Sequence, residues 1–391
     1  MNKSTATVIM VSTFRELEAA LLDESVLSIK ITADITFENN ISYIPLRSVV
    51  VDGDGHKINT GKYAIYADSN KINTYSLTIK NATIVGDADV GRVFEHPSTG
   101  WDLFVSDVTY TGMRFAHLSC GTITFSGANN ITTNAENAWV ENVIFEASSK
   151  YTGVAARVGE FSAFYFNGNA VNGKATVKES AEVSLTIGDG KYATYPAFWD
   201  RVELIEVDKS AQLAINSYGY AVHFNRADME KNARITVAEN AILSLTSDGG
   251  NNHEAVKFDQ VGTIEVADGG SLFIAGNPKS NTKGIISMAS GSEIIMGTVR
   301  DFKFFNRTKS APIFDTANTR ITLHVVDKIS VWARIGGEYD NAPLTSWSDA
   351  RMATIVDGSA SFNTTSTVDA LQDNFQMDDY GCFSAHDEAS L

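Results

Sequence analysis

The chain has 391 residues, of which 43% are apolar, with 29 glycines and 6 prolines. Its formal net charge is −16 and its pI is about 4.8, so its surface repels phosphate backbones and we expect no nucleic-acid partner. No run approaches the roughly 20 apolar residues that span a bilayer, so we expect no membrane insertion. Short Val, Ile and Leu runs beside Asn, Asp and Ser favour many short strands over a helical bundle.

One helix is predicted, close to the start of the chain. Thr13-Phe-Arg-Glu16 has the form of a capping box, in which the Thr hydroxyl accepts from the third amide and Glu reaches back. Apolar residues then recur at helical spacing: Phe14, Leu17, Ala20 and Leu21. We therefore expect an amphipathic helix to about Leu22, within an entry segment of residues 11–26, that covers the open end of the strands that follow.

From about residue 170 the sequence repeats itself. Each copy contains a large apolar residue, a polar triplet, a small residue and two apolar residues two positions apart, beginning with Val177-Lys-Glu-Ser-Ala-Glu-Val-Ser-Leu185. The next copies begin at Val207, Val237 and Val266, after intervals of 30, 30 and 29 residues, and a fifth is assigned to Met288 after 22. Such a period is typical of a solenoid in which each coil stacks on its neighbours.

Each copy is interpreted as a corner between two strands. The first apolar residue ends one strand, the triplet turns the chain, and the alternating pair points inward from the next strand. In the first half of the chain, Asn81 and Asp107 are expected at similar corners, because Asn and Asp accept left-handed backbone conformations. The predicted fold class is all-β, a right-handed parallel β-helix with an N-terminal capping helix. An antiparallel sandwich with coincidental hairpins is the alternative.

We expect a single β-helix domain over residues 1–391, with coils over about 27–305 and a closing region over about 306–391 that is less regular and rich in aromatics. The two cysteines, Cys120 and Cys382, do not have the spacing of a disulfide framework or a zinc site. We expect both to be unpaired thiols, with at least one of them buried.

Aromatic residues gather in two neighbouring copies of the repeat and supply the predicted ligand-binding residues. These are Tyr192, Tyr195, Trp199, Tyr218, Tyr220, His223 and Arg226. Flat rings stack on sugar faces while neighbouring polar groups hydrogen-bond hydroxyls, so the cluster suits a glycan or another small ligand. The alternative is that these aromatics alternate into the core of the solenoid.

Two acidic pairs are the candidates for a cation site. Asp52 and Asp54 flank a glycine, and Asp87 and Asp89 flank an alanine, so each pair can present two carboxylates on one face of an extended chain. Calcium is the one cofactor considered, but it needs about six to eight oxygens, and plain turn chemistry explains the same residues. The sequence nominates no catalytic residue.

Several segments carry a family resemblance. They are Val11–Leu21, Ile29–Ile35, Arg47–Gly55, Ile329–Trp332 and Pro343–Trp347. Over roughly residues 11–350 the chain resembles the pectate-lyase-like adhesive domain of cell-surface proteins from Gram-positive bacteria of the lactobacillus, enterococcus and listeria kind. The resemblance implies a β-helix used for adhesion, with a carbohydrate or a host-surface protein as ligand and no required enzymatic activity.

The resemblance also implies an extracellular location at the bacterial cell surface and cell wall, as part of a larger surface protein. The chain has no secretion signal and no Leu-Pro-x-Thr-Gly sorting motif, which we interpret as the sign of an excised adhesive domain. Two other functions stay open. One is a polysaccharide lyase or hydrolase with the same architecture, and the other is a structural stalk or a phage tail component.

Overall fold

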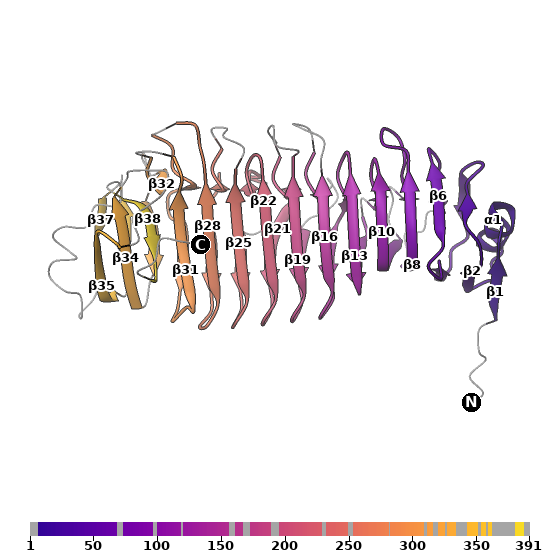
Figure 1. Cartoon of the computed structure of the whole chain (residues 1–391), viewed down its shortest axis with the longest axis horizontal. Helices are drawn as coiled ribbons and strands as arrows, with labels where there is room; N and C mark the ends of the chain where they lie inside the picture. Colours follow the sequence, from indigo (N-terminus) through magenta and orange to yellow (C-terminus); the bar gives the residue numbers. More distant parts are fainter. Residues whose placement is uncertain are drawn as a thin grey trace, which may run out of the picture.

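The protein forms an elongated stack of short strands. The computed structural model describes residues 7–68, 73–96, 100–118, 120–155, 161–166, 173–188, 195–228, 232–248, 253–280, 282–308, 311–315, 320–324, 327–333, 342–350, 353–356, 359–361 and 380–386. Helix α1 (Phe14–Leu22) lies at one end of the stack, and antiparallel strands lie at the other (Figure 1). No described helix has both the length and the apolar character that crossing a membrane requires.

Each coil contributes one strand to each of three faces. In one coil, β18 (Gly173–Val177) lies on the first face, β19 (Glu182–Ile187) on the second and β20 (Phe198–Asp200) on the third. Each of these strands pairs in parallel with its counterpart in a neighbouring coil, so the hydrogen bonds run along the axis of the stack. The structure confirms the predicted right-handed parallel β-helix, whose handedness is the one that parallel crossovers almost always adopt.

Within each face, the strands lie in the order in which they occur along the chain, one coil after the next. The first face contains β1 (Val8–Val11), β2 (Ser28–Ile31), β5 (Val49–Asp52), β12 (Thr122–Ser126), β15 (Asn142–Phe145), β18, β21 (Val202–Val207), β24 (Ala233–Val237), β27 (Gly262–Val266), β30 (Glu293–Met296) and β33 (Arg320–His324). The second face contains β3 (Ile35–Thr36), β6 (Lys57–Gly61), β13 (Ala128–Thr133), β16 (Lys150–Ala155), β19, β22 (Gln212–Ser217), β25 (Ile242–Ser247), β28 (Ser271–Gly276) and β31 (Asp301–Asn306). Two long strands, β8 (Tyr75–Gly86) and β10 (Trp101–Gly112), run through the corner and belong to both faces.

The third face is divided between two sheets. A seven-stranded sheet contains β4 (Ile41–Ile44), β7 (Ile65–Ala67), β9 (Phe94–Glu95), β11 (Ala116–His117), β14 (Ala138–Val140), β17 (Phe164–Phe166) and β20. A four-stranded sheet then contains β23 (Val222–Phe224), β26 (Val256–Phe258), β29 (Ile286–Met288) and β32 (Phe314–Asp315). All neighbouring strands within these two sheets pair in parallel.

The apolar residues that open the repeat copies lie in one file inside the stack. The members of this file are Val177, Val207, Val237 and Val266, each buried and paired with the next. The fifth copy was wrongly predicted, because Val266 pairs with Met296 and not with Met288. Met288 lies on β29, so the triplet after it turns a different corner, from the third face to the first. This explains its irregular interval.

The corner between the first and second faces needs a left-handed residue. Positive φ values between 51° and 74° occur at Asn81, Asp107, Ser180, Ser210, Asn240 and Gly269. After Ser180, Ser210 and Asn240 the next residue is a buried alanine whose amide closes the turn, with Ala211 N donating to Asp208 O at 3.0 Å. The structure thus confirms the predicted corners at Asn81 and Asp107.

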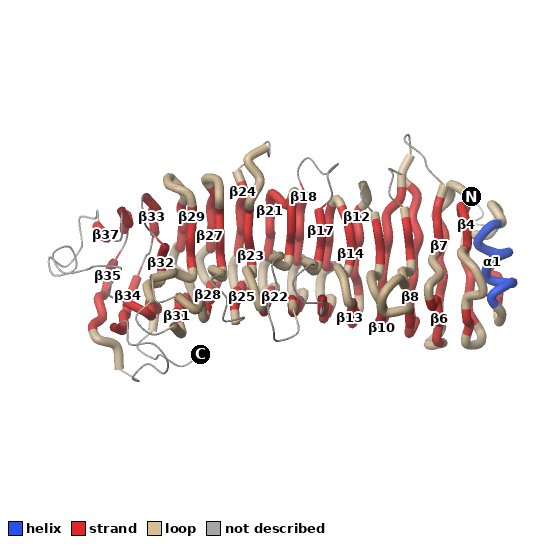
Figure 2. Tube along the Cα trace, turned by 90° about the horizontal axis from the view of Figure 1, so that it is seen from above, coloured by secondary structure: helices blue, strands red, loops and turns tan. Residues whose placement is uncertain are grey.

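The N-terminal helix has the predicted capping box and the predicted buried face. Thr13 Oγ1 accepts from the amide of Glu16, and the Glu16 carboxylate accepts from the amide of Thr13 at 3.2 Å. The buried residues of the helix are Phe14, Leu17, Ala20 and Leu21. They pack on the inward side chains of the first coils, so the helix closes this end of the core (Figure 2).

At the other end the strand direction changes. The strands there are β34 (Asp327–Ala333), β35 (Thr345–Ala350), β36 (Ala353–Val356), β37 (Ser359–Ser361) and β38 (Tyr380–Ser384). They pair antiparallel with one another, and β38 also pairs antiparallel with β31. Cys382 is buried in β38, Cys120 is half-buried, and the two form no disulfide. The proposed domain limits remain a prediction.

The inward file of the second face offers a direct test of the core. Leu213 points inward from β22 with 1% of its surface exposed, whereas its neighbour Gln212 is exposed. We expect Leu213→Ala to lower the free energy of unfolding by about 2–5 kcal/mol, because it leaves a cavity between coils. Gln212→Ala should change it by less than about 0.5 kcal/mol. Chemical denaturation measures both, and equal effects would contradict the assigned register.

Candidate functional site

The strands of the third face share a short sequence pattern. Its clearest copies are Ser162-Ala-Phe-Tyr-Phe166, Pro196-Ala-Phe-Trp-Asp200, Tyr220-Ala-Val-His-Phe224 and Glu254-Ala-Val-Lys-Phe258. The second and third residues of each copy are buried, and the fourth is partly exposed. Because side chains alternate along a strand, the fourth residue points outward from the stack.

We call the outward residues of this face the outer ladder. It consists of Glu95, His117, Trp139, Tyr165, Trp199, His223 and Lys257. Backbone pairing places neighbouring members at the same position in successive coils, except between Trp199 and His223, where ring contact at 5.9 Å continues the row. Paired strands are about 4.8 Å apart, so the rings repeat along the axis at nearly contact distance.

Trp139 is held by three neighbours. Its ring meets His117 at 4.5 Å and Tyr165 at 5.1 Å between ring centroids, both edge to face. The Arg114 guanidinium lies 4.3 Å from the same ring, a cation–π arrangement, and its Nη2 donates to Glu136 Oε2 at 2.7 Å. The Arg114–Glu136 pair is buried, so the orientation of the indole is fixed before any ligand arrives.

Glu95 is the first residue of the ladder, and it contacts charged and polar side chains. Its Oε1 lies 2.9 Å from His117 Nδ1, and its Oε2 pairs with Arg92. Burial raises the pKa of Glu95, but hydrogen bonds from His117 and Arg92 outweigh it and lower the pKa overall. Glu95 is therefore ionised and orients the first ring of the ladder.

A continuous run of rings crosses the later coils. Tyr195 contacts Trp199 with centroids 4.7 Å apart, and Trp199 contacts His223 at 5.9 Å. Tyr220 stands between two histidines, at 4.5 Å from His223 and 4.3 Å from His253. These rings present a half-buried apolar surface with polar edges, which suits stacking against a flat polar ligand.

His223 is both oriented and kept neutral. Its Nε2 lies 2.8 Å from Asp259 Oδ2, and Lys257 Nζ lies 3.3 Å from the other oxygen of this carboxylate. Burial lowers the pKa of His223, although Asp259 acts in the opposite direction. Burial likewise lowers the pKa of His253. Near neutral pH the two rings therefore offer neutral donors and acceptors rather than charge.

The structure brings four of the seven predicted ligand-binding residues together. These are Tyr195, Trp199, Tyr220 and His223. Tyr218 is half-buried and packs against the core instead. Arg226 lies off the ladder, with Nη1 2.9 Å from Asp200 Oδ1 and Nε 2.8 Å from Asp228 Oδ1. Tyr192 lies outside the described residues.

The two acidic pairs take part in turns and ion pairs. Asp52 and Asp54 each pair with a lysine, at 3.0 and 2.8 Å. One oxygen of Asp87 accepts from the amide of Asp89 at 2.8 Å. In the part of the chain that the structure describes, no group of three or more His, Cys, Asp or Glu could hold a metal ion. Calcium binding at these pairs remains an untested prediction.

The sequence reading missed much of the ladder. The missed members include His117, Trp139, Tyr165 and Lys257, with Asp259 beside them. For Tyr165 and Lys257 the signal is the short pattern of an alanine, an apolar residue, a variable residue and usually a phenylalanine, which recurs from coil to coil. His117 and Trp139 directly follow an alanine and do not match this pattern. The variable position of that pattern is the outward one.

Comparison with known proteins confirms the family resemblance over part of the chain. Residues 8–117 match the model of a family described as a putative pectate lyase-like adhesive domain. None of the curated protein sequences matches the chain significantly.

Two solved structures from Lactobacillus reuteri are similar to this chain. The SRRP (serine-rich repeat protein) of strain 100-23 has a TM-score of 0.54 at 13% identity, covering 80% of this chain and 96% of its own. The SRRP of strain 53608 has a TM-score of 0.44 at 20% identity, covering 77% and 96%. The similarity to the first structure supports the β-helix fold over a larger part of the chain than the family model matches.

The buried histidine provides a pH test of this geometry. The lowered pKa of His223 means that, as the pH falls below the ordinary value of 6.5, unfolded chains take up a proton that the folded chain resists. Stability is therefore lost as the pH falls toward the lowered value. We expect His223→Gln to lose less unfolding free energy than the unaltered chain between about pH 7 and 5. Parallel pH series of denaturation curves measure the difference, and identical slopes would contradict a buried neutral His223.

Proposed function

We propose that this chain is a non-catalytic adhesive domain of a bacterial surface protein that binds a glycan along the outer ladder. The observation that carries the proposal is the row of outward rings, from His117 to His223, held at one position on successive coils. A row of this kind offers stacking sites at regular steps along one axis, which suits an extended chain of rings.

Three further features support this function. The adhesive description of the family model covers the first coils, including Glu95 and His117 of the ladder. The ladder is oriented by buried or half-buried ion pairs, such as Arg114–Glu136, so little conformational entropy is lost when a ligand binds. The net charge of −16 keeps the long stack soluble, as a surface-exposed extracellular domain requires. A host-surface protein is the alternative ligand for the same face.

Trp199→Ala tests the ladder directly. Removing this ring breaks the row between Tyr195 and His223, and we expect glycan affinity to fall about 10- to 100-fold, the loss typical of a binding hot spot. The matched control is Phe104→Ala, because Phe104 is an aromatic residue of the first face with 42% of its surface exposed. Affinity is measured on the best ligand from a glycan array.

The two variants separate the possible outcomes. Equal losses in both, or none in Trp199→Ala, would place binding elsewhere on the surface. An array with no glycan ligand, together with a trimeric state in solution, would favour the structural stalk or phage tail component.

A polysaccharide lyase or hydrolase is the second candidate function. The observation that favours it is the contact between His223 and Asp259, since a carboxylate that orients a neutral histidine is the arrangement of a general base. We expect no unsaturated products and no new reducing ends when the chain is incubated with pectin, alginate and related polymers. Turnover that is abolished by His223→Gln would replace adhesion with catalysis at the same face.

A further inference from the structure

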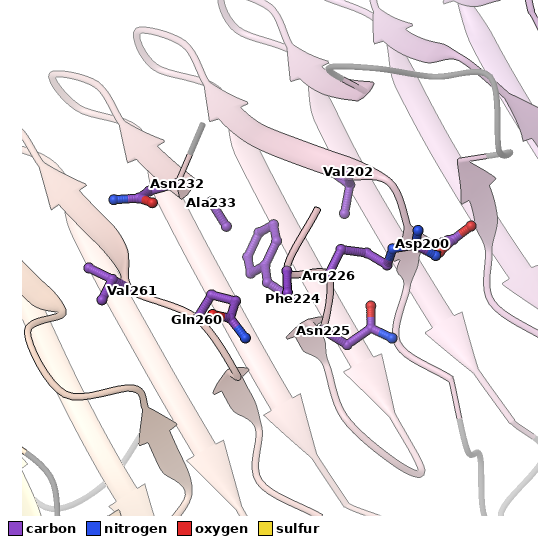
Figure 3. Close-up of a pocket in the computed structure, with 10 residues that line it drawn as sticks. Asp200, Val202, Phe224, Asn225, Arg226, Asn232, Ala233, Gln260 and Val261 are labelled. Atoms are coloured by element: carbon purple, nitrogen blue, oxygen red, sulfur yellow. The ribbon is translucent and has the colours of Figure 1, made fainter. Parts of the chain in front are cut away.

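A hollow adjoins the outer ladder where the third face changes sheets. The seven-stranded sheet ends at β20, and the four-stranded sheet begins at β23. Asp200, the last residue of β20, has a φ of 77°, and it takes the place that buried Phe166 occupies one coil earlier. The hollow lies at this break, between Asp200, Phe224 and Val261 (Figure 3).

The size of the hollow matches one ring. Its volume is about 160 Å³. An engineered cavity of about 150 Å³ in another protein takes up benzene, so this hollow has room for a single six-membered ring. Apolar side chains contribute to its wall: Val202, Phe224, Ala227, Ala233 and Val261.

The charges around the hollow are already paired with one another. Arg226 donates through Nη1 to Asp200 at 2.9 Å and through Nε and Nη2 to Asp228 at 2.8 and 2.7 Å. Arg201 Nη2 also donates to Asp228, at 3.1 Å. Two guanidinium groups thus balance two carboxylates, and Arg226 has both sides of its fork engaged. Because the two carboxylates already neutralise the two guanidinium groups, an anionic ligand would add an unbalanced negative charge, whereas a neutral ligand leaves the charge balance unchanged.

The remaining polar groups of the hollow are suited to hydrogen bonds with hydroxyl groups of a ligand. Asn225 Oδ1 is buried and accepts no hydrogen bond from any described residue. The exposed amides of Asn232 and Gln260 stand at the rim (Figure 3). Amides donate and accept, and a hydroxyl does both as well, so a ring bearing several hydroxyl groups satisfies them together. A buried acceptor without a donor is unfavourable, so turning the Asn225 oxygen into the hollow to accept from a ligand hydroxyl removes that cost.

We propose that the hollow is a subsite for one neutral pyranose ring, and that it discriminates against uronic acids and other anionic sugars. The ligand class rests on the proposed function, because it assumes that the chain binds glycans. The subsite adds selectivity to the ladder. The rings of the ladder stack against many different sugar units, whereas the hollow binds one uncharged sugar unit beside them.

The test uses free monosaccharides, so that binding to the hollow is measured independently of polymer binding along the ladder. The probes are the methyl pyranosides of glucose, galactose and mannose, and the matched glucuronate and galacturonate. Binding to the full chain is followed by saturation-transfer NMR and titration. We expect at least one neutral pyranoside to bind and the uronates to bind about tenfold more weakly or not at all.

Three variants assign the signal to the hollow. Val261→Trp fills it from the exposed rim, and Asn225→Leu removes the unpartnered acceptor, so each should weaken the neutral probe about tenfold or more. Val90→Trp is the matched control, because Val90 is another exposed valine that does not line the hollow, and it should bind normally. Thermal melts confirm that the variants fold.

The outcomes distinguish the two proposals. Neutral pyranoside binding that survives Val261→Trp, or uronate binding equal to that of the neutral probe, overturns the subsite. If polymeric glycans bind through Trp199 while no monosaccharide binds, the subsite fails and the proposed function stands. If the pyranoside binds at the hollow while no polymer depends on Trp199, the ladder fails and the subsite stands.

Discussion

Backbone hydrogen bonds between the strands of the coils join one coil to the next, so a single coil has neither partners for its strands nor a core of its own. This constraint sets the register of every coil. A slip by one residue would turn the buried file that contains Val207 outward and bury the opposite side chains. The same pairing that lines up the aliphatic core therefore lines up the outward residues. The positions of the outer ladder therefore follow from the stacking of the coils. The function depends on which side chains occupy those positions.

A feature of the fold could be predicted from the sequence when the residues that determine it lie next to one another in the chain. The helix was predictable because a capping box and a helical stripe occupy ten consecutive residues, Thr13–Leu22. The corners were predictable because a left-handed residue and a small buried one follow each other directly, as at Ser210 and Ala211. The fifth copy was misassigned because the corner after Met288 uses similar polar residues for a different pair of faces. Local similarity does not identify which corner is turned.

The candidate site was harder to predict for a physical reason. Third-face strands are two to four residues long, too short to show a periodicity, and the segments that precede them vary in length. Aromatic clustering found Trp199 and His223. Trp139 has no aromatic residue in its own segment, and Tyr165 lies between two buried phenylalanines of the core, so both join the ladder only through pairing between coils. The hollow was beyond sequence reasoning altogether, because it depends on one backbone angle at Asp200 and on where one sheet gives way to another.

The central claim is that successive coils hold the outward rings in a single row along which a glycan lies. A crystal structure of the chain with a bound oligosaccharide measures this most directly. The account predicts sugar rings over β14, β17, β20 and β23, with the oligosaccharide running along the axis of the stack and stacked on Trp139 or Trp199. A ligand bound on the first or second face, with the third face unoccupied, would contradict it.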